Sequence, residues 1–250
     1  MVLCQGPAGV RFEWGATGAA VLAESCAVLV VVDVLSFTTA VSVLAERGTG
    51  VHPFPWDGPE SVAYAERSGA VLAAGRRAAT PEHPWSLSPA ALLRAPAVPE
   101  LVLPSPNGSA ICAAAAPTGT EVVAAGLRNA PAVARWLIAQ GYGTGLRPVG
   151  VVAAGERWPD GSLRPAVEDL LGAAIVLDGL SDAEGGLSVE AAVALSVLDA
   201  VTDVPAAVRG SVSGRELERG GFGADVEVAV RIGASDVVPV LRGGVFRAAT

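Results

Sequence analysis

The chain has 250 residues and a formal net charge of −8, from 25 acidic and 17 basic side chains. An acidic balance of this size argues against non-specific binding to nucleic acid. All 17 basic residues are arginine, which excludes Schiff-base chemistry at lysine and a P-loop lysine, so an anion site here has to use arginine, hydroxyl groups and backbone amides.

Hydrophobic residues make up 51% of the chain and the mean hydropathy is +0.48, so a membrane protein has to be considered. The most apolar window, residues 27–45, carries Asp33 near its middle, and no other clean apolar stretch reaches about 18 residues. We therefore expect no membrane partner. The N-terminus lacks the basic segment of a signal peptide. Cys4, Cys26 and Cys112 are scattered without a paired spacing, which predicts reduced thiols in a cytoplasmic protein.

The predicted elements begin with the apolar run AVLVVVDVL at residues 27–35, which is typical of a strand buried on both faces. A helix is predicted over residues 38–47, and a second strand follows at 51–56. The spacing of apolar residues from 60 to 68 predicts a helix that ends at the following glycine. A third strand is predicted at residues 70–75.

The proline-rich residues 79–89 predict an irregular segment, and a short helix follows at 90–95. Three longer units each show a strand, a polar loop and then a helix, and they span residues 101–116, 121–141 and 148–180. A further helix is predicted at about residues 189–201. The tail predicts a small helix and two or three strands, one of which begins at Asp225.

Short strands that alternate with helices predict an α/β fold. We expect a three-layer α/β/α arrangement with a largely parallel sheet, plus a smaller C-terminal α/β lobe packed against it. Two organisations stay open: an N-terminal lobe at residues 1–160 with a C-terminal lobe at 161–250, or a single compact unit. A homodimer is the assembly we consider.

Polar residues follow four of the predicted strands at the point where each strand ends. Ligands of open parallel sheets bind in the crevice beyond these carboxyl ends. The residues concerned are Asp33 after the first strand; Ser105, Asn107, Gly108 and Ser109 after LVLP; Gly126, Arg128 and Asn129 after EVVAA; and Glu156 and Arg157 after GVVAAG. Four such ends at one edge of a sheet predict a ligand site.

Each of these motifs also has a purely structural interpretation. Asp33 is either an N-cap of the next helix or a site carboxylate, and the second is slightly favoured because Ser36 or Thr38 could cap equally well. The SPNGS segment is either a turn or a loop whose amides and hydroxyls cradle an anion at a helix N-terminus. The GLRN segment is either a helix start capped by Asn129, with Arg128 in solvent, or the carrier of a phosphate clamp, Arg128.

Acidic residues cluster in AGERWPDGSLRPAVEDLLGA. Glu168 and Asp169 fall in the first turn of the predicted helix, where the macrodipole favours negative charge, and Asp160 lies in the preceding loop. Solvent exposure is the simplest expectation for these three acids. Glu156 directly follows a strand and is the stronger candidate. Two or three acids converging with Asp33 would form an oxygen-rich site for a hard divalent cation such as Mg²⁺.

Taken in order, DVLSFTT, LPSPNGS, GLRNA and AGERWPDGSLRPAVEDLLGA resemble the 2-phosphosulfolactate phosphatase family, the Mg²⁺-dependent phosphatases of coenzyme M biosynthesis. The similarity runs from about residue 28 to residue 245. It implies an α/β fold of two packed lobes, a bound magnesium ion, and hydrolysis of a phosphate monoester on a small acidic three-carbon compound.

The chain departs from the family pattern at two places. The family commonly has DVLRATT, and Ser36 stands where that arginine would be. The family also commonly has a glutamate-bearing GERGG loop and an NSP turn. Here the sequence AAGRR brings Arg76 and Arg77 to that loop, and Leu87 precedes the retained Ser-Pro pair. Losing an arginine at one place and gaining arginines at another leaves the reaction class in place and predicts altered substrate recognition.

These observations lead to a mechanistic hypothesis, the metal-assisted transfer of a phosphoryl group to water. Asp33 and Glu156 are the predicted catalytic residues and hold Mg²⁺ together with Asp169. The predicted phosphate- and substrate-binding residues are Ser36, Thr38, Ser105, Asn107, Gly108, Ser109, Arg128 and Asn129.

Asp33 is either a metal ligand or a covalent nucleophile, and the sequence favours a ligand. Haloacid-dehalogenase-type aspartyl chemistry usually shows Asp-x-Asp and a phosphate-contacting lysine, whereas this chain has Leu35 at the third position and no lysine. Two other functions stay open. One is a catalytically silent module that binds a phosphorylated metabolite, supported by the departure at Ser36. The other is a hydrolase or isomerase acting on carboxylates in the same cleft.

Overall fold

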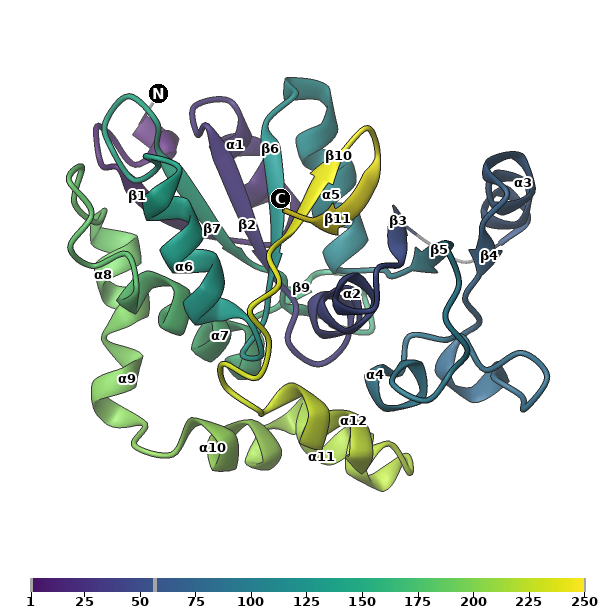
Figure 1. Ribbon diagram of the computed structural model, residues 1–250. Coiled ribbons are helices and arrows are strands. Elements are labelled where there is room, and N and C mark those ends of the chain that lie inside the picture. The colour runs from purple at the N-terminus through teal and green to yellow at the C-terminus, as the bar shows by residue number, and fades with distance from the viewer. Residues whose placement is uncertain (1, 56–57, 250) are drawn as a thin grey trace.

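The computed structural model describes residues 2–55 and 58–249, and its centre is a nine-stranded, mostly parallel sheet flanked by helices (Figure 1). The predicted α/β fold is therefore confirmed. The sheet consists of β1 (Val10–Trp14), β2 (Val28–Val32), β3 (Gly50–Phe54), β4 (Val71–Leu72), β5 (Glu100–Pro104), β6 (Glu121–Ala125), β7 (Val149–Ala153), β10 (Pro239–Arg242) and β11 (Val245–Ala248). A separate two-stranded hairpin consists of β8 (Glu156–Arg157) and β9 (Leu163–Arg164).

The helices alternate with the strands in the first two thirds of the chain and dominate the last third. They are α1 (Gly15–Ala23), α2 (Phe37–Glu46), α3 (Pro59–Ser68), α4 (Pro89–Leu92), α5 (Gly108–Ala115), α6 (Ala130–Ala139), α7 (Val167–Asp178), α8 (Val189–Leu195), α9 (Val197–Ala200), α10 (Val204–Gly210), α11 (Val212–Arg219) and α12 (Gly223–Ala229). Short 3₁₀ turns lie at Val2–Cys4, Arg76–Ala78 and Ala116–Thr118.

The valine run that precedes Asp33 forms β2, a central strand buried along its whole length. Side chains of a strand alternate between the two faces of the sheet. Val28, Val30 and Val32 accordingly enter one hydrophobic cluster, which includes residues of α6, α7 and α8. Leu29 and Val31 enter a second cluster, which includes residues of α1, α2 and α5. A strand covered on both faces needs a continuous apolar sequence, and this explains why VLVVV has no polar position.

The strands form two parallel groups, β1-β7-β2-β6 and β3-β5-β4. The antiparallel hairpin β10–β11 joins them, because β10 pairs with β6 and β11 pairs with β3. In Figure 1 the first group is seen along its length, and β3, β5 and β4 are turned away from it. The prediction of four polar strand ends at one sheet edge is therefore wrong, because residues 105–109 follow β5 of the second group. They still reach Asp33, since α5 packs back against β2.

Most of the predicted elements are confirmed, with small shifts at their ends. The predicted strand at 70–75 is only the two residues of β4. The second strand ends at Phe54, and Trp56, which the prediction included, lies outside the described residues. The prediction of a strand beginning at Asp225 is wrong, because this residue lies in α12. That helix packs against α4 and buries Asp225, so tertiary contacts override the β-propensity of its valines.

The last third of the chain is not a separate sheet. Helices α8 to α12 run down one side of the molecule and along its base, and the chain then returns to insert β10 and β11 into the central sheet (Figure 1). The division into two lobes near residue 160 stays a prediction. Within residues 2–55 and 58–249, no single helix is long and apolar enough to cross a membrane. One pair bent by 95°, Val189–Ala200 with Val204–Gly210, meets that requirement by length and composition only.

Candidate active site

Asp33 stands where β2 ends, and its carboxylate joins the N-termini of two helices. Oδ1 accepts a hydrogen bond from the backbone N–H of Phe37 at 3.2 Å, at the start of α2. Oδ2 accepts one from the N–H of Gly108 at 3.0 Å, at the start of α5. Thr38 fixes the backbone of Asp33, because its hydroxyl accepts from the Asp33 N–H at 3.0 Å and donates to the Asp33 carbonyl at 2.7 Å. Asp33 thus satisfies helix-end amides and also lies among the other acids of the site.

The environment of Asp33 favours its neutral form. Burial raises the pKa of Asp33 to about 7, and the nearby charge of Glu156 adds to the increase. The amides of Phe37 and Gly108 and the guanidinium of Arg76 act in the opposite direction. Desolvation therefore outweighs two hydrogen bonds and one cation, which is the balance expected for a carboxyl group that is only 8% exposed.

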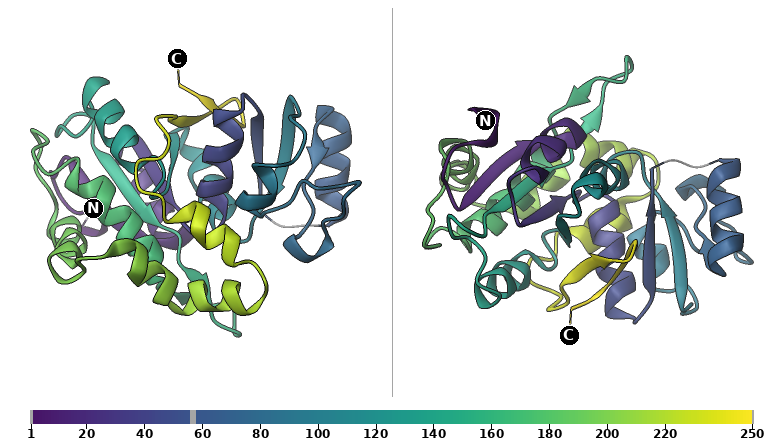
Figure 2. Two further views of the ribbon diagram at one scale, coloured as in Figure 1. Left: turned by 60° about the horizontal axis from the view of Figure 1, so that its bottom comes forward. Right: turned by 90° about the horizontal axis from the view of Figure 1, so that it is seen from above.

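Glu156 comes from the next strand in the sheet, at the point where β7 leads into the β8–β9 hairpin. This hairpin projects from the body of the molecule in the right view of Figure 2. The Glu156 Oε2 atom accepts a hydrogen bond from Asn107 Nδ2 at 2.9 Å, which ties the hairpin to the SPNGS loop. Burial raises the pKa of Glu156, the bond from Asn107 lowers it, and the charge of Glu168 raises it.

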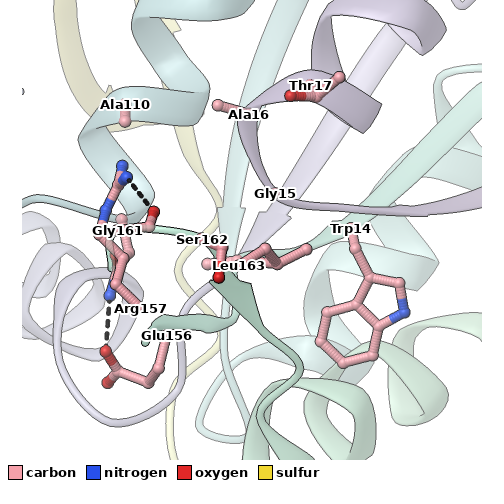
Figure 3. Close-up of a pocket in the computed structure, with 12 residues that line it drawn as sticks. Trp14, Gly15, Ala16, Thr17, Ala110, Glu156, Arg157, Gly161, Ser162 and Leu163 are labelled. Carbon is pink, nitrogen blue, oxygen red and sulfur yellow. Dashed lines mark hydrogen bonds between the residues drawn. The ribbon is translucent and has the colours of Figure 1, made fainter. Parts of the chain in front are cut away.

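A pocket of about 300 Å³ opens beside Glu156 (Figure 3). The hairpin supplies Glu156 and Arg157 to its wall, the start of α1 supplies Gly15, and the SPNGS loop supplies Asn107. The Arg157 guanidinium donates to the carbonyl oxygen of Pro106 at 3.1 Å, so a cation lies over this loop. The pocket therefore combines an acid, an amide side chain and an arginine in a half-open space.

Asp169 and Glu168 lie in the first turn of α7, as predicted, but the expectation that they are solvated is wrong. They are 3% and 2% exposed. Asp169 Oδ1 accepts from the N–H of Val34 at 2.8 Å, and Oδ2 accepts from that of Gly155 at 2.9 Å, so this carboxylate links the segments that follow β2 and β7. Burial raises the pKa of Asp169 well above its ordinary value, and the charges of Asp33 and Glu168 add to the effect.

Glu168 was not among the predicted site residues. Its charge acts on both Glu156 and Asp169, and among the described residues it has no hydrogen-bond or ion-pair partner. The residue is almost completely buried, yet its carboxylate oxygens keep contact with solvent and accept no hydrogen bond from the described residues, so they are free to bind a ligand. Asp160, expected to be solvated, is exposed.

The SPNGS loop brings three of its predicted residues to the acids or to an adjoining pocket. Asn107 and Gly108 contact Glu156 and Asp33 directly. Ser105 is 2% exposed and lines a second pocket, which also includes Arg76. Ser109 points back into the molecule, where its hydroxyl donates to the carbonyl of Leu103 at 3.4 Å. The loop thus presents backbone and amide groups to the site, and only one of its two hydroxyls lies beside a pocket.

Gly108 is required by close packing. A Cβ atom at this position would lie 2.3 Å from a ring carbon of Phe37 and 3.0 Å from Oδ2 of Asp33. Real Cβ atoms do not approach their neighbours so closely. A glycine therefore allows the first amide of α5 to reach the Asp33 carboxylate.

Arg128 and Asn129 are not brought to the acids. The Arg128 guanidinium donates to Glu46 at 2.9 Å, at the end of α2 opposite to the one that meets Asp33. Arg128 is 5% exposed, so the alternative of a solvated side chain is wrong as well. Asn129 accepts from the Gly126 N–H and donates to the carbonyls of Ala124 and Val237, and its side chain does not cap α6. Both residues stabilise the loop after β6.

Comparison with known proteins matches residues 18–244 to the family model described as 2-phosphosulpholactate phosphatase. The chain belongs to this family. Two relatives, from Deinococcus radiodurans and Thermus thermophilus, are each called "Probable 2-phosphosulfolactate phosphatase". The first is 31% identical over 222 residues, covering 87% of this chain and 88% of the relative. The second is 31% identical over 229 residues, covering 88% and 90%.

Membership of this family makes the chain a phosphatase, that is, a phosphoric monoester hydrolase. Arg76 supplies a cation beside Ser36, where the family pattern predicts an arginine. Its Nη2 group donates to Ser36 Oγ at 2.6 Å and to the Leu35 carbonyl at 3.2 Å. Its Nε group donates to Asp225 at 3.0 Å. The guanidinium that position 36 lacks therefore arrives from the 3₁₀ turn Arg76–Ala78 and lies against the Ser36 hydroxyl.

The donor set of the site suits magnesium. Mg²⁺ prefers oxygen ligands and is commonly bound by one or two carboxylates together with waters and substrate phosphates. Within the described ranges, no three or more His, Cys, Asp or Glu side chains are placed so that together they could hold a metal ion, so any cation here would need ligands from substrate or water. Glu168, buried without a partner, and Glu156, bonded through one oxygen only, have free carboxylate oxygens, and this chemistry fits a cation completed by phosphate and water.

Proposed function

We propose that the chain is a Mg²⁺-dependent phosphatase that hydrolyses the phosphate monoester of a small acidic metabolite, converting 2-phosphosulfolactate and water to sulfolactate and phosphate. Its membership of the family supports the reaction class. The observation that carries the proposal is that two acids meet at the SPNGS loop: Asp33 accepts from the N–H of Gly108 at the start of α5, and Glu156 accepts from the side chain of Asn107.

The acids have different tasks in this proposal. Glu156 and Glu168 offer free carboxylate oxygens to the cation. Each oxygen of Asp33 keeps a lone pair after accepting its N–H bond, so Asp33 has the capacity to act as a further ligand. Asp169 was predicted as a ligand, and its two amide contacts support a positioning role that holds Val34 and Gly155 in place. The bound Mg²⁺ supplies Lewis-acid stabilisation of the phosphate oxygens.

The phosphoryl group has two sets of protein donors. The first set is at the start of α5, where Asn107 and Ala110 line the pocket, and a helix N-terminus is a favourable place for phosphate oxygens. Arg157 adds a positive charge to the pocket. In the reaction the bond between phosphorus and the ester oxygen breaks, and a bond to a water oxygen forms. The donors offset the negative charge that is spread over the phosphoryl oxygens as this happens.

Phosphate release from 2-phosphosulfolactate, measured with MgCl2 and with EDTA, tests the proposal. Glu156→Gln is expected to lower kcat/KM at least about 100-fold, because it removes a carboxylate from the cation while keeping the side-chain shape. Asp160→Asn is the matched control, since Asp160 is an exposed acid in the turn of the same hairpin, and it is expected to leave the rate unchanged. Full turnover in EDTA, or equal rates for the two variants, would contradict the proposal.

A catalytically silent binding protein remains the second candidate. The observation that favours it is that three acids of the site hold raised pKa values and no preformed metal group is found among the described residues. A melting temperature that rises with the phosphate ester, without release of phosphate, would identify a binder. A place in coenzyme M biosynthesis, a cytoplasmic location and a homodimer stay predictions.

A further inference from the structure

Two pockets each include part of the SPNGS loop in their walls. The pocket of about 300 Å³ holds Asn107, Glu156 and Arg157. A second pocket, of about 360 Å³, is lined by Arg76, Ser105 and Pro106 among other residues. Arg76 also borders a third pocket, of about 520 Å³, between its 3₁₀ turn and α11. Glu156 and Arg76 therefore line different pockets, and the loop contributes to the wall of both the first and the second.

The guanidinium of Arg76 is held on one side and open on the other. Asp225 accepts from its Nε group, and Ser36 and Leu35 accept from Nη2. The Nη1 group, which carries two N–H donors, has no hydrogen-bond partner among the described residues. The side chain of Arg76 is 17% exposed. A fixed arginine with two unused donors at a pocket wall is suited to bind an anion.

The anchor of Arg76 is itself fixed. The carboxylate of Asp225 is 3% exposed in the side chain and accepts from the Ser88 hydroxyl at 2.6 Å and from the Ala90 N–H at 3.0 Å. It therefore receives three hydrogen bonds from two different segments. Asp225 orients Arg76 and leaves its Nη1 side free.

We propose that Arg76, oriented by Asp225, is the specificity-determining residue that binds the non-phosphoryl acid group of the substrate, a carboxylate or a sulfonate. The inference rests on the proposed function, because it assigns the second half of the same substrate. The phosphoryl group binds at the acids, and the other acid group binds at Arg76, whose Nη2 group contacts Leu35 and Ser36 just after Asp33 in the chain. Asp225 is a positioning residue that acts only through Arg76.

Binding measurements test this assignment without turnover. Calorimetry with sulfolactate and with inorganic phosphate, each with MgCl2, is carried out on the wild type, Arg76→Ala and Arg77→Ala. Arg77 is the matched control, an exposed arginine next in the same 3₁₀ turn. Arg76→Ala is expected to lower the affinity for sulfolactate about 10- to 100-fold, which is the usual loss for a charged hydrogen bond. The affinity for phosphate is expected to fall less than about 3-fold. Arg77→Ala is expected to change neither.

Kinetics on three esters with one skeleton identify the acid group. Glycerol 2-phosphate lacks both acid groups, 2-phosphoglycerate has the carboxylate, and 2-phosphosulfolactate has the carboxylate and the sulfonate. Arg76→Ala is expected to raise KM about 10- to 100-fold for acid-bearing esters and to spare glycerol 2-phosphate. A loss with 2-phosphoglycerate assigns the carboxylate, and a loss with 2-phosphosulfolactate alone assigns the sulfonate. Asp225→Asn should raise KM for the acid-bearing esters by a smaller factor than Arg76→Ala does. A uniform loss of kcat on all three esters would contradict a positioning role for Asp225.

The outcomes separate the two proposals. The role of Arg76 would be overturned by any of three results. Arg76→Ala could weaken the binding of sulfolactate and phosphate equally, it could weaken neither, or the wild type could fail to bind sulfolactate. Sulfolactate binding that depends on Arg76, in a protein that releases no phosphate from any ester, would refute the phosphatase and keep this inference. If the protein hydrolyses 2-phosphosulfolactate and Arg76→Ala does not alter the rate, the phosphatase is kept and the role of Arg76 is refuted.

Discussion

The buried acids predict an unusual dependence of stability on pH in the metal-free protein. The pKa of Asp33 is raised by burial and by Glu156, and burial also raises the pKa values of Glu156 and Asp169. Between the ordinary pKa of an aspartate and the raised one, the folded chain holds a proton that the unfolded chain releases. For Asp33, the stabilisation is therefore complete below about pH 4 and is lost as the pH rises through about 7, and Glu156 and Asp169 act in the same direction.

The size of the effect follows from Asp33. Its pKa rises from an ordinary 3.8 to about 7. Because a tenfold change in proton affinity corresponds to about 1.4 kcal/mol, the full effect is about 4 kcal/mol, and about 3 kcal/mol of it falls between pH 5 and pH 8. A domain is commonly stable by only 5–15 kcal/mol, roughly, so the loss is a large share of the total. Mg²⁺ at about 100 times its dissociation constant would restore about 2.7 kcal/mol at pH 8.

Urea unfolding followed by circular dichroism, in EDTA at pH 5, 6, 7 and 8, measures this dependence. The free energy of unfolding is expected to fall steadily over the series, and MgCl2 is expected to raise it at pH 8 more than at pH 5. Asp33→Asn should flatten the pH dependence, whereas Asp160→Asn, at an exposed acid, should leave it unchanged. Stability that rises from pH 5 to pH 8 in EDTA, or an unaltered slope in Asp33→Asn, would refute the reasoning.

Two further predictions concern the same cluster. Gly108→Ala places a Cβ atom 2.3 Å from the buried ring of Phe37, so it is expected to lower the free energy of unfolding by about 1–3 kcal/mol in the same urea assay, and a stability equal to the wild type would contradict the close packing. Glu168→Gln is expected to weaken Mg²⁺ binding about 10-fold in calorimetry with MgCl2, because Glu168 is buried without a partner; unchanged affinity would remove it from the metal ligands.

The sequence located the parts of the site whose position depends on where a strand ends. Asp33 and Glu156 directly follow the apolar runs of β2 and β7, which are neighbours in the sheet, so the crevice rule placed both correctly. The same rule failed for Arg128. A long side chain can leave the strand end in several directions, and this one runs to Glu46 at the far end of α2. Strand register determines where the Cα atom of Arg128 lies, but it does not determine where the guanidinium group lies.

Other features depend on contacts between distant segments, which a local pattern does not contain. Arg76 is held by Asp225, 149 residues away, and the sequence showed only that an arginine had appeared near the loop. Glu168 has the pattern of a solvated helix-start acid, and only tertiary packing makes it buried. The insertion of β10–β11 between the two parallel groups likewise follows from long-range pairing with β6 and β3. Local propensity could indicate the hairpin but could not place it.

The arrangement of the acids connects the stability of the protein to its proposed reaction. Asp33 and Asp169 each accept two backbone N–H bonds, yet desolvation still raises both pKa values, so the folded chain keeps charged carboxylates at a cost. A divalent cation removes this cost by pairing with the carboxylates, and proton release must accompany its binding wherever an acid was still protonated. At pH 8 the metal-free protein is destabilised by the cost of keeping these buried carboxylates charged. Cation binding relieves that cost, so the same free energy favours binding at this pH. Acids arranged only for stability would have been left in solvent, as Asp160 is.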